Sequence, residues 1–118
     1  MFLSRSDDDG VTWSPPVDAN RLKRGSGAGT GHDGGRQLSA GPHRGRLLIP
    51  VYSGGPYVAY SDDHGRSWHV GGTVPVEHYA GGGTSAGEWT LAETGSYGED
   101  GTPILLASVR NAPNIPEG

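Results

Sequence analysis

The chain has 118 residues, the size of one modest domain, and its hydrophobic share of 32% lies below the roughly 45–50% of an ordinary globular protein. A formal net charge of −4 at pH 7 provides no basic field to attract nucleic acid or an anionic membrane surface. The sequence has no cysteine, which excludes disulfides, thiol nucleophiles and thiolate zinc sites.

Glycine and proline are abundant, with 22 and 9 copies, a content at which low-complexity disorder has to be considered. Short apolar groups and aromatic residues stand between the glycine clusters, however, as is typical of short strands joined by many turns. No window has apolar residues at helical spacing, so the sequence predicts an all-β fold without helix. The expected strands, in chain order, are 1–5, 12–17, 36–40, 46–53, 57–61, 67–72, 88–93 and 103–110.

A turn motif with a serine, an aspartate, a glycine and a tryptophan at fixed offsets occurs twice, 55 positions apart. That spacing is close to the roughly 40–50 residues of one four-stranded propeller blade, with the glycine-rich stretch 25–35 as a loop insertion. About eight strands would then make two blades of four. The glycine stretch is not a nucleotide-binding loop, because neither a lysine-serine pair nor a helical pattern follows it. The motif residues are Ser6, Asp8, Gly10 and Trp13, and Ser61, Asp63, Gly65 and Trp68.

Turn chemistry explains the residue types of both motifs. The aspartate can accept hydrogen bonds from backbone amides of the loop, as in Asx turns, and the glycine can take a positive φ without steric cost. The tryptophan begins the return strand and can bury its ring against the blade. Paired acids also suggest the carboxylates of a glycosidase, but the hairpin turns explain these residues without any substrate.

The last two expected strands predict a hairpin that turns around residues 98–101. Facing residues then have numbers that sum to about 198, which places Glu88 opposite Arg110 at the open end of the hairpin. Such a pair could serve an axial site, or it could be an ordinary exposed cross-strand ion pair. By alternation Glu93 shares a face with Trp89 and is expected to be a blade-edge residue or a surface charge.

Residues 45–52, 57–68 and 88–111 together resemble the middle of an exo-α-sialidase that carries Asp-box repeats. The resemblance covers nearly the whole chain, is strongest over 45–111 and weakest over 14–35. It implies a six-bladed β-propeller that cleaves terminal α-linked sialic acid at its axis, with three arginines, a tyrosine nucleophile activated by a glutamate, and an aspartate acid/base.

Two members of that set are carried over by the resemblance. Glu88 matches the glutamate that partners the nucleophilic tyrosine, and Arg110 matches the second arginine, which holds the sialic acid carboxylate. The resemblance places the first arginine and the aspartate before the first motif, and the tyrosine and the third arginine well after the second. Residues 1–118 are thus expected to be one partial propeller domain, made of a blade with the motif 6–13, a blade with the motif 61–68 and the start of a hairpin at 88–111. We expect the isolated chain to be inactive and to need the missing blades for a full fold.

Two alternatives to the enzyme stay open. A non-catalytic carbohydrate-binding or interaction propeller would retain the turns and lack the chemistry, and a structural remnant with open strand edges would not fold. An arginine and an aspartate before residue 1, and an arginine and a tyrosine beyond residue 118, would favour the enzyme.

A sialylated glycan is the expected partner, with neither nucleic acid nor a cofactor. No metal site is expected, because His64, His69 and His32 lack the spacing of ligands. The resemblance allows a substrate-side role for His32 and Asp33. Tyr79 and Tyr97 are expected in loops and are not assigned as the nucleophile. No signal peptide or membrane-spanning segment is recognised, and the compartment is not predicted.

Overall fold

The computed structural model describes residues 1–24, 29–30, 34–75 and 86–111. In these ranges the fold is all-β, as predicted, and a single turn of 3₁₀ helix is the only helical element. The elements are β1 (Phe2–Leu3), β2 (Val17–Asp18), η1 (Asn20–Leu22), β3 (Gly29–Thr30), β4 (Arg36–Gln37), β5 (Leu47–Tyr52), β6 (Pro56–Ser61), β7 (His69–Thr73), β8 (Ala86–Tyr97) and β9 (Pro103–Asn111).

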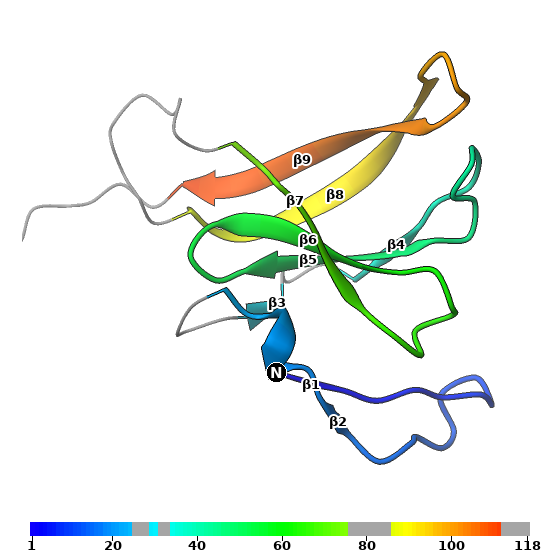
Figure 1. Ribbon diagram of the computed structural model, residues 1–118, viewed down its shortest axis with the longest axis vertical. Coiled ribbons are helices and arrows are strands. Elements are labelled where there is room, and N and C mark those ends of the chain that lie inside the picture. The colour runs from blue at the N-terminus through cyan, green and yellow to red at the C-terminus, as the bar shows by residue number, and fades with distance from the viewer. Residues whose placement is uncertain (25–28, 31–33, 76–85, 112–118) are drawn as a thin grey trace, which may run out of the picture.

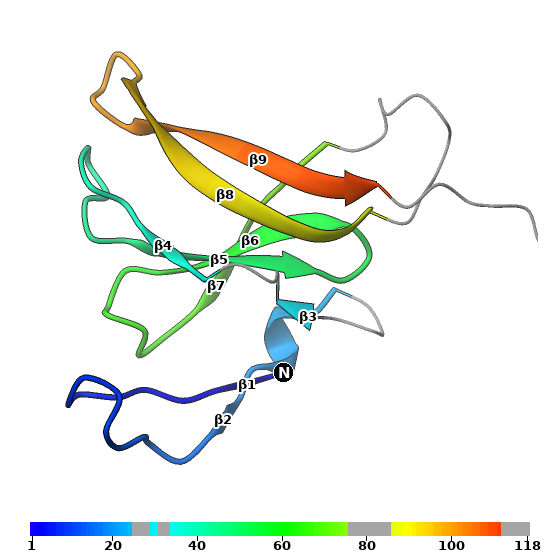
Figure 2. The same cartoon turned by 180° about the vertical axis from the view of Figure 1, so that it is seen from behind.

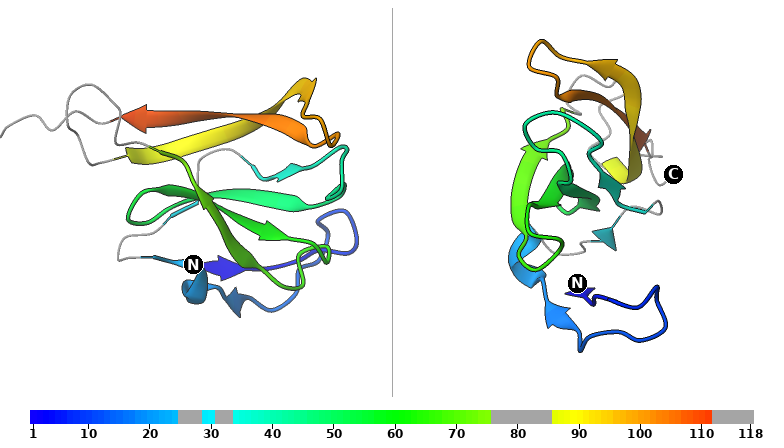
Figure 3. Two further views of the ribbon diagram at one scale, coloured as in Figure 1. Left: turned by 45° about the horizontal axis from the view of Figure 1, so that its top comes forward. Right: turned by 90° about the vertical axis from the view of Figure 1, so that its right-hand side faces the viewer.

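The strands form three antiparallel sheets, which lie one above another in the views of Figures 1 and 3. The first sheet pairs β1 with β2, and the last sheet pairs β8 with β9. In the middle sheet, β3 and β4 pair with successive parts of β5, which is followed by β6 and β7. The separate hairpin at 88–111 agrees with the sequence, whereas the strands before it form sheets of two and five strands and not blades of four.

The observed strands differ in length from the expected ones. β1 and β2 are short, because the residues that follow them toward the first turn do not continue a regular ladder. There the Ser14 backbone N–H donates to the Arg5 carbonyl, whereas the Arg5 backbone N–H donates to the Ser14 hydroxyl. β8 is longer than expected, since its ladder with β9 continues through a register shift beyond Glu93 as far as Tyr97. β3 lies inside the stretch that the sequence predicts as a loop.

The middle sheet is buried on both sides, because alternate side chains of its central strands pack against the sheets above and below. One core cluster lies toward the first sheet and the other toward the last. Their buried members are Ala19, Leu22, Val51, Tyr57 and Ala59 in the first cluster, and Leu38, Leu48, Trp89 and Leu91 in the second.

The two ends of the molecule differ in the chain segments that they carry. The turns 6–13, 61–68 and 98–102 lie at one end, on the right in Figure 1, and on the left when seen from behind in Figure 2. The beginning of β8 and the end of β9 lie at the opposite end. The hairpin β8–β9 therefore presents its open end away from the turns that carry the repeated motif.

Candidate functional site

The side chains of Glu88 and Arg110 meet at the open end of the hairpin, as predicted. The ladder from Trp89↔Val109 to Glu93↔Leu105 keeps the predicted register, with residue numbers that sum to 198, and the register shifts between Ala86 and Trp89. Although Glu88 stands at this irregularity, Arg110 Nη1 donates to Glu88 Oε2 over 2.7 Å.

Both charged groups of this pair are accessible to solvent. The side chain of Arg110 is 67% exposed and that of Glu88 is 30% exposed. The pKa of the Arg110 guanidinium is raised, because the Glu88 carboxylate accepts its hydrogen bond and adds an attractive charge. A guanidinium this exposed keeps donors available for a carboxylate-bearing ligand.

The other carboxylate of this strand, that of Glu93, forms its hydrogen bonds with a different part of the fold. Its Oε1 accepts from the backbone N–H of Ser39 over 2.7 Å, and its Oε2 accepts from the Ser39 hydroxyl over 2.5 Å. These two hydrogen bonds lower the pKa of Glu93. The contact ties β8 to the loop after β4, so Glu93 joins two sheets, a role that sequence reasoning missed. Its alternation with Trp89 and Leu91, which face the middle sheet, was the available signal.

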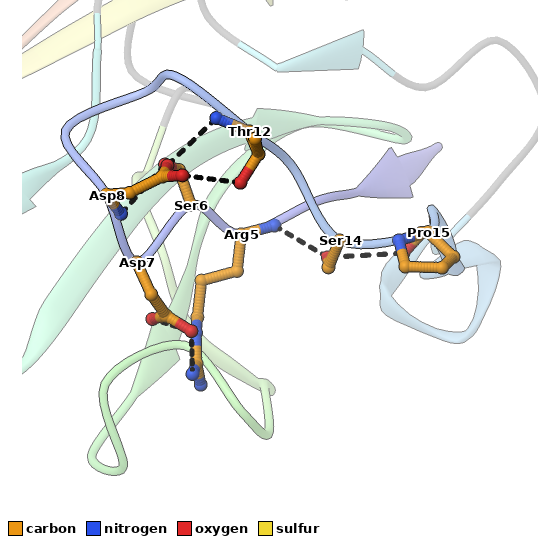
Figure 4. A network of polar contacts seen from close by, with 7 residues as sticks. All are labelled: Arg5, Ser6, Asp7, Asp8, Thr12, Ser14 and Pro15. Carbon is orange, nitrogen blue, oxygen red and sulfur yellow. Dashed lines mark hydrogen bonds and ion pairs between the residues drawn. The ribbon is translucent and has the colours of Figure 1, made fainter.

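The two repeated turns have the same hydrogen-bond network. Figure 4 shows the first, where Asp8 accepts from the Thr12 backbone N–H over 2.8 Å, from the Thr12 hydroxyl over 2.5 Å and from the Ser6 hydroxyl over 2.8 Å. In the second turn Asp63 accepts the corresponding three bonds over 2.8, 2.6 and 2.8 Å, from Ser67 and Ser61.

The backbone of the two turns is also the same. The residue before the glycine has a φ of 58° at Asp9 and 60° at His64, and the glycine itself has a φ of 85° at Gly10 and 83° at Gly65. Both glycines lie in the left-handed region that favours glycine, as the sequence predicts.

The donors around both aspartates stabilise the ionised carboxylate. They lower the pKa of Asp8 to about 2, with the Thr12 hydroxyl as the largest cause, and they lower the pKa of Asp63 as well, mainly through the Ser67 hydroxyl. A carboxyl group that stays ionised at neutral pH and has its oxygens occupied cannot serve as a general acid there. The two aspartates therefore stabilise their turns.

The tryptophans of the two repeated turns differ in their burial. Each indole N–H donates to the glycine carbonyl of its own turn, over 3.2 Å for Trp13 and 3.0 Å for Trp68. Trp68 packs against the first core cluster, whereas Trp13 is 64% exposed. The expectation that Trp13 buries its ring is thus wrong. In the second turn, Leu47 of the neighbouring strand β5 lies beside the turn. In the described part of the chain the first sheet has only the strands β1 and β2, so no equivalent strand there lies beside the first turn.

Within the described residues, no three His, Asp or Glu side chains are grouped as a metal site would require. In the same part of the chain no helix has the length and apolar character to cross a membrane. His32, Asp33, Tyr79 and most of the glycine stretch 25–31 lie outside the described residues.

The comparisons with known proteins point to one class of enzyme. The chain is 33% identical over 107 residues to an anhydrosialidase of Macrobdella decora, a match that covers 81% of this chain and 13% of that protein. It is 36% identical over 85 residues to a sialidase of Micromonospora viridifaciens, covering 63% of this chain and 13% of that protein. The chain resembles part of a sialidase. No protein-family model matches it, and it spans about an eighth of the length of these relatives.

Proposed function

We propose that the chain is part of an exo-α-sialidase propeller, in which Glu88 and Arg110 contribute to the site for terminal sialic acid. The contact between Arg110 Nη1 and Glu88 Oε2 carries this proposal, because it brings together two residues that the resemblance assigns to one site. In the proposed roles, Arg110 binds the sialic acid carboxylate, and Glu88 activates a tyrosine nucleophile.

The chemistry of sialic acid explains why these residue types suit the reaction. The anomeric carbon bears a carboxylate, which would repel an anionic aspartate or glutamate nucleophile, whereas a phenol deprotonated in place by a glutamate would not be repelled. A guanidinium matches the carboxylate with two parallel hydrogen bonds, a geometry that lysine cannot provide. The remaining groups of the reaction belong to the rest of such a propeller.

A chimera tests the proposal. The matching segment of the Micromonospora viridifaciens sialidase is replaced with residues 45–111 of this chain, and hydrolysis of the fluorogenic 4-methylumbelliferyl sialoside is measured. We expect an active chimera, in which Glu88→Gln and Arg110→Ala each lower kcat/KM by about 100-fold or more.

Glu93→Gln in the same chimera is the matched control. It removes a carboxylate from the same strand as Glu88, but this carboxylate contacts Ser39 and not Arg110. We expect this variant to retain activity within about threefold. A folded chimera, judged by circular dichroism, that lacks sialidase activity would contradict the proposal. So would equal losses on replacing Glu88 and Glu93.

A non-catalytic carbohydrate-binding or interaction propeller is the second candidate. It is favoured by the exposed position of the Glu88–Arg110 pair, in which the two charges neutralise each other. A chimera that binds sialyllactose but does not hydrolyse the fluorogenic sialoside would support this function over the enzyme.

A further inference from the structure

The register shift at the open end of the β8–β9 hairpin is a β-bulge that contains Glu88. The regular ladder of the hairpin ends at the pair Trp89↔Val109. Beyond this pair, two residues of β8, Gly87 and Glu88, stand opposite Arg110 alone before the pairing resumes. A bulge of this kind interrupts the ladder and changes the direction of a side chain. The orientation of the Glu88 carboxylate therefore depends on the residues that hold the bulge in place.

Trp89 holds one side of this bulge on the middle sheet. Its side chain is 4% exposed and belongs to the second core cluster. Its indole N–H donates to the backbone carbonyl of Val51, in β5, over 3.0 Å. This bond fixes the direction of the ring, because a rotated indole would leave its N–H without a partner in the core. The backbone next to Glu88 is thus tied to the middle sheet both by a buried ring and by a directed hydrogen bond.

Other residues of the hairpin tie the site end less directly. Val109, which faces Trp89 in the ladder, packs against the same cluster but is only partly buried, and its side chain has no hydrogen-bond donor. The backbone carbonyl of Leu91 and the side chain of Glu93 also bond to the middle sheet. Both residues lie farther along β8, on the side of Trp89 away from the bulge. Trp89 is therefore the best placed of these residues to control Glu88.

A carboxylate that activates a nucleophile needs such control. It has to be held within about 0.5 Å of its productive position, by residues that are themselves fixed by packing. The contact of Glu88 with Arg110 is exposed, and an exposed ion pair orders its two side chains only weakly. A buried anchor on the neighbouring residue adds the precision that an exposed pair lacks.

We propose that Trp89 is a positioning residue for Glu88 in the sialidase reaction. The indole, fixed by Val51, holds the bulge so that the Glu88 carboxylate reaches both Arg110 and the nucleophilic phenol. In this role Trp89 acts through Glu88 and does not contact the substrate. The inference rests on the proposed function of Glu88 and extends it to a residue of the core.

Trp89→Phe in the chimera tests the inference, because phenylalanine keeps an aromatic ring in the core and lacks the donor to Val51. We expect kcat for the fluorogenic sialoside to fall by about tenfold, with KM changed by less than about twofold. The effect falls on kcat because Glu88 acts in the chemical step, whereas Arg110, which binds the substrate carboxylate, lies on the other strand. Rates are measured well below the lowest Tm of the variants, and circular dichroism checks that each variant folds.

Leu91→Ala in the same chimera is the matched control. Leu91 is 3% exposed and lies in the same strand and the same core cluster as Trp89. Truncation of a buried leucine costs at least as much stability as the loss of one hydrogen bond. We expect Leu91→Ala to lower Tm by at least as much as Trp89→Phe does, and to keep kcat within about threefold. Equal losses of kcat in the two variants would overturn the inference, because they would reflect stability alone.

The double variant Glu88→Gln/Trp89→Phe decides whether Trp89 acts through Glu88. If it does, the double variant has the same kcat as Glu88→Gln, since no carboxylate is left to position. A further loss of about tenfold in the double variant, or an unchanged kcat in Trp89→Phe, would overturn this inference alone. Full activity in Glu88→Gln would contradict the proposed function of Glu88 itself, so the failures of the two proposals are distinguishable.

Discussion

At the scale of single residues, the two repeated turns are held by the same set of side-chain hydrogen bonds. In each, a carboxylate accepts three hydrogen bonds, two from a threonine or serine four positions later and one from a serine two positions earlier. Hydrogen bonds to an ionised acceptor are about twice as strong as neutral ones. The turns therefore depend on the charge of Asp8 and Asp63.

That dependence predicts a loss of stability in acid. The folded pKa of Asp8, about 2, and that of Asp63 lie below the unfolded value of about 3.9. A depressed carboxyl pKa contributes stability that is present above the unfolded pKa and is lost as the pH falls through the folded pKa. Thermal melts between pH 6 and pH 2 should therefore show Tm falling below about pH 4.

Asp63→Asn should make this fall less steep, because it removes one of the titrating groups. It should also lower Tm at pH 6 by more than Asp8→Asn does, since the second turn adjoins the core and the first is exposed. Glu99→Gln, in the turn between β8 and β9, controls for the loss of one negative charge. An unchanged acid profile in Asp63→Asn would contradict the structural role of this carboxylate.

The residue types of these turns could be predicted from the sequence, because an Asx turn and a glycine with positive φ depend on local chemistry alone. The environment of Trp13 could not. Its motif is equivalent to that of Trp68, yet burial of the ring depends on whether a strand like β5 lies beside the turn. That is a property of the sheet, which the eight residues of the motif do not encode.

At the scale of elements, the hairpin β8–β9 is attached to the middle sheet by two buried side chains, those of Trp89 and Leu91, and by a few polar contacts. Trp89 is 4% exposed, and its indole N–H donates to the Val51 carbonyl over 3.0 Å. Nearby, Arg36 Nε donates to the Leu91 carbonyl over 3.0 Å. Since Trp89 is a large buried side chain and also donates a hydrogen bond to the middle sheet, its truncation should weaken the docking of the hairpin.

Trp89→Ala is expected to lower the free energy of unfolding by about 3–5 kcal/mol, the usual cost of truncating a buried tryptophan. Urea denaturation measures the loss. Trp89→Phe keeps most of the apolar volume and removes the donor to Val51, at about 1–3 kcal/mol. Tyr97→Ala, at an exposed position of the same strand, should stay within about 0.5 kcal/mol.

Hydrogen exchange separates docking from global stability in Trp89→Phe. Protection should fall in residues 86–111 before it falls in β5 and β6, if Trp89 holds the last sheet on the middle one. A uniform loss over all three sheets would show that the hairpin and the middle sheet unfold as one unit.

The hairpin itself was predictable because its register follows from two strands and one short turn, all local in sequence. The contact between Glu88 and Arg110 followed from that register. The contact between Glu93 and Ser39 was not predictable, because it joins residues 54 positions apart through the packing of two sheets. The further hairpin at 88–111 was expected, but the grouping of eight strands into two blades of four was not what the structure shows. The spacing between the turns gives the length of one repeat and does not show at which strand a sheet begins.

At the scale of the whole molecule, a two-stranded sheet lies on each side of the five-stranded middle sheet. Glu88 and Arg110 are the two residues of the chain that the resemblance assigns to the catalytic site, and they are in contact. The aspartate acid/base and the further arginines that the resemblance implies have no matching positions in the chain, and none of its tyrosines is assigned as the nucleophile. These two residues therefore form only a part of the site that the resemblance implies.

We therefore expect the 118-residue chain to release no 4-methylumbelliferone from the fluorogenic sialoside. One glutamate and one arginine can orient a carboxylate, but they supply neither a nucleophile for the anomeric carbon nor a proton for the leaving group. The measurement is the rate of 4-methylumbelliferone release above the no-enzyme control. Turnover that disappears in both Glu88→Gln and Arg110→Ala would contradict the prediction, because it would mean that residues of this chain complete the catalytic set.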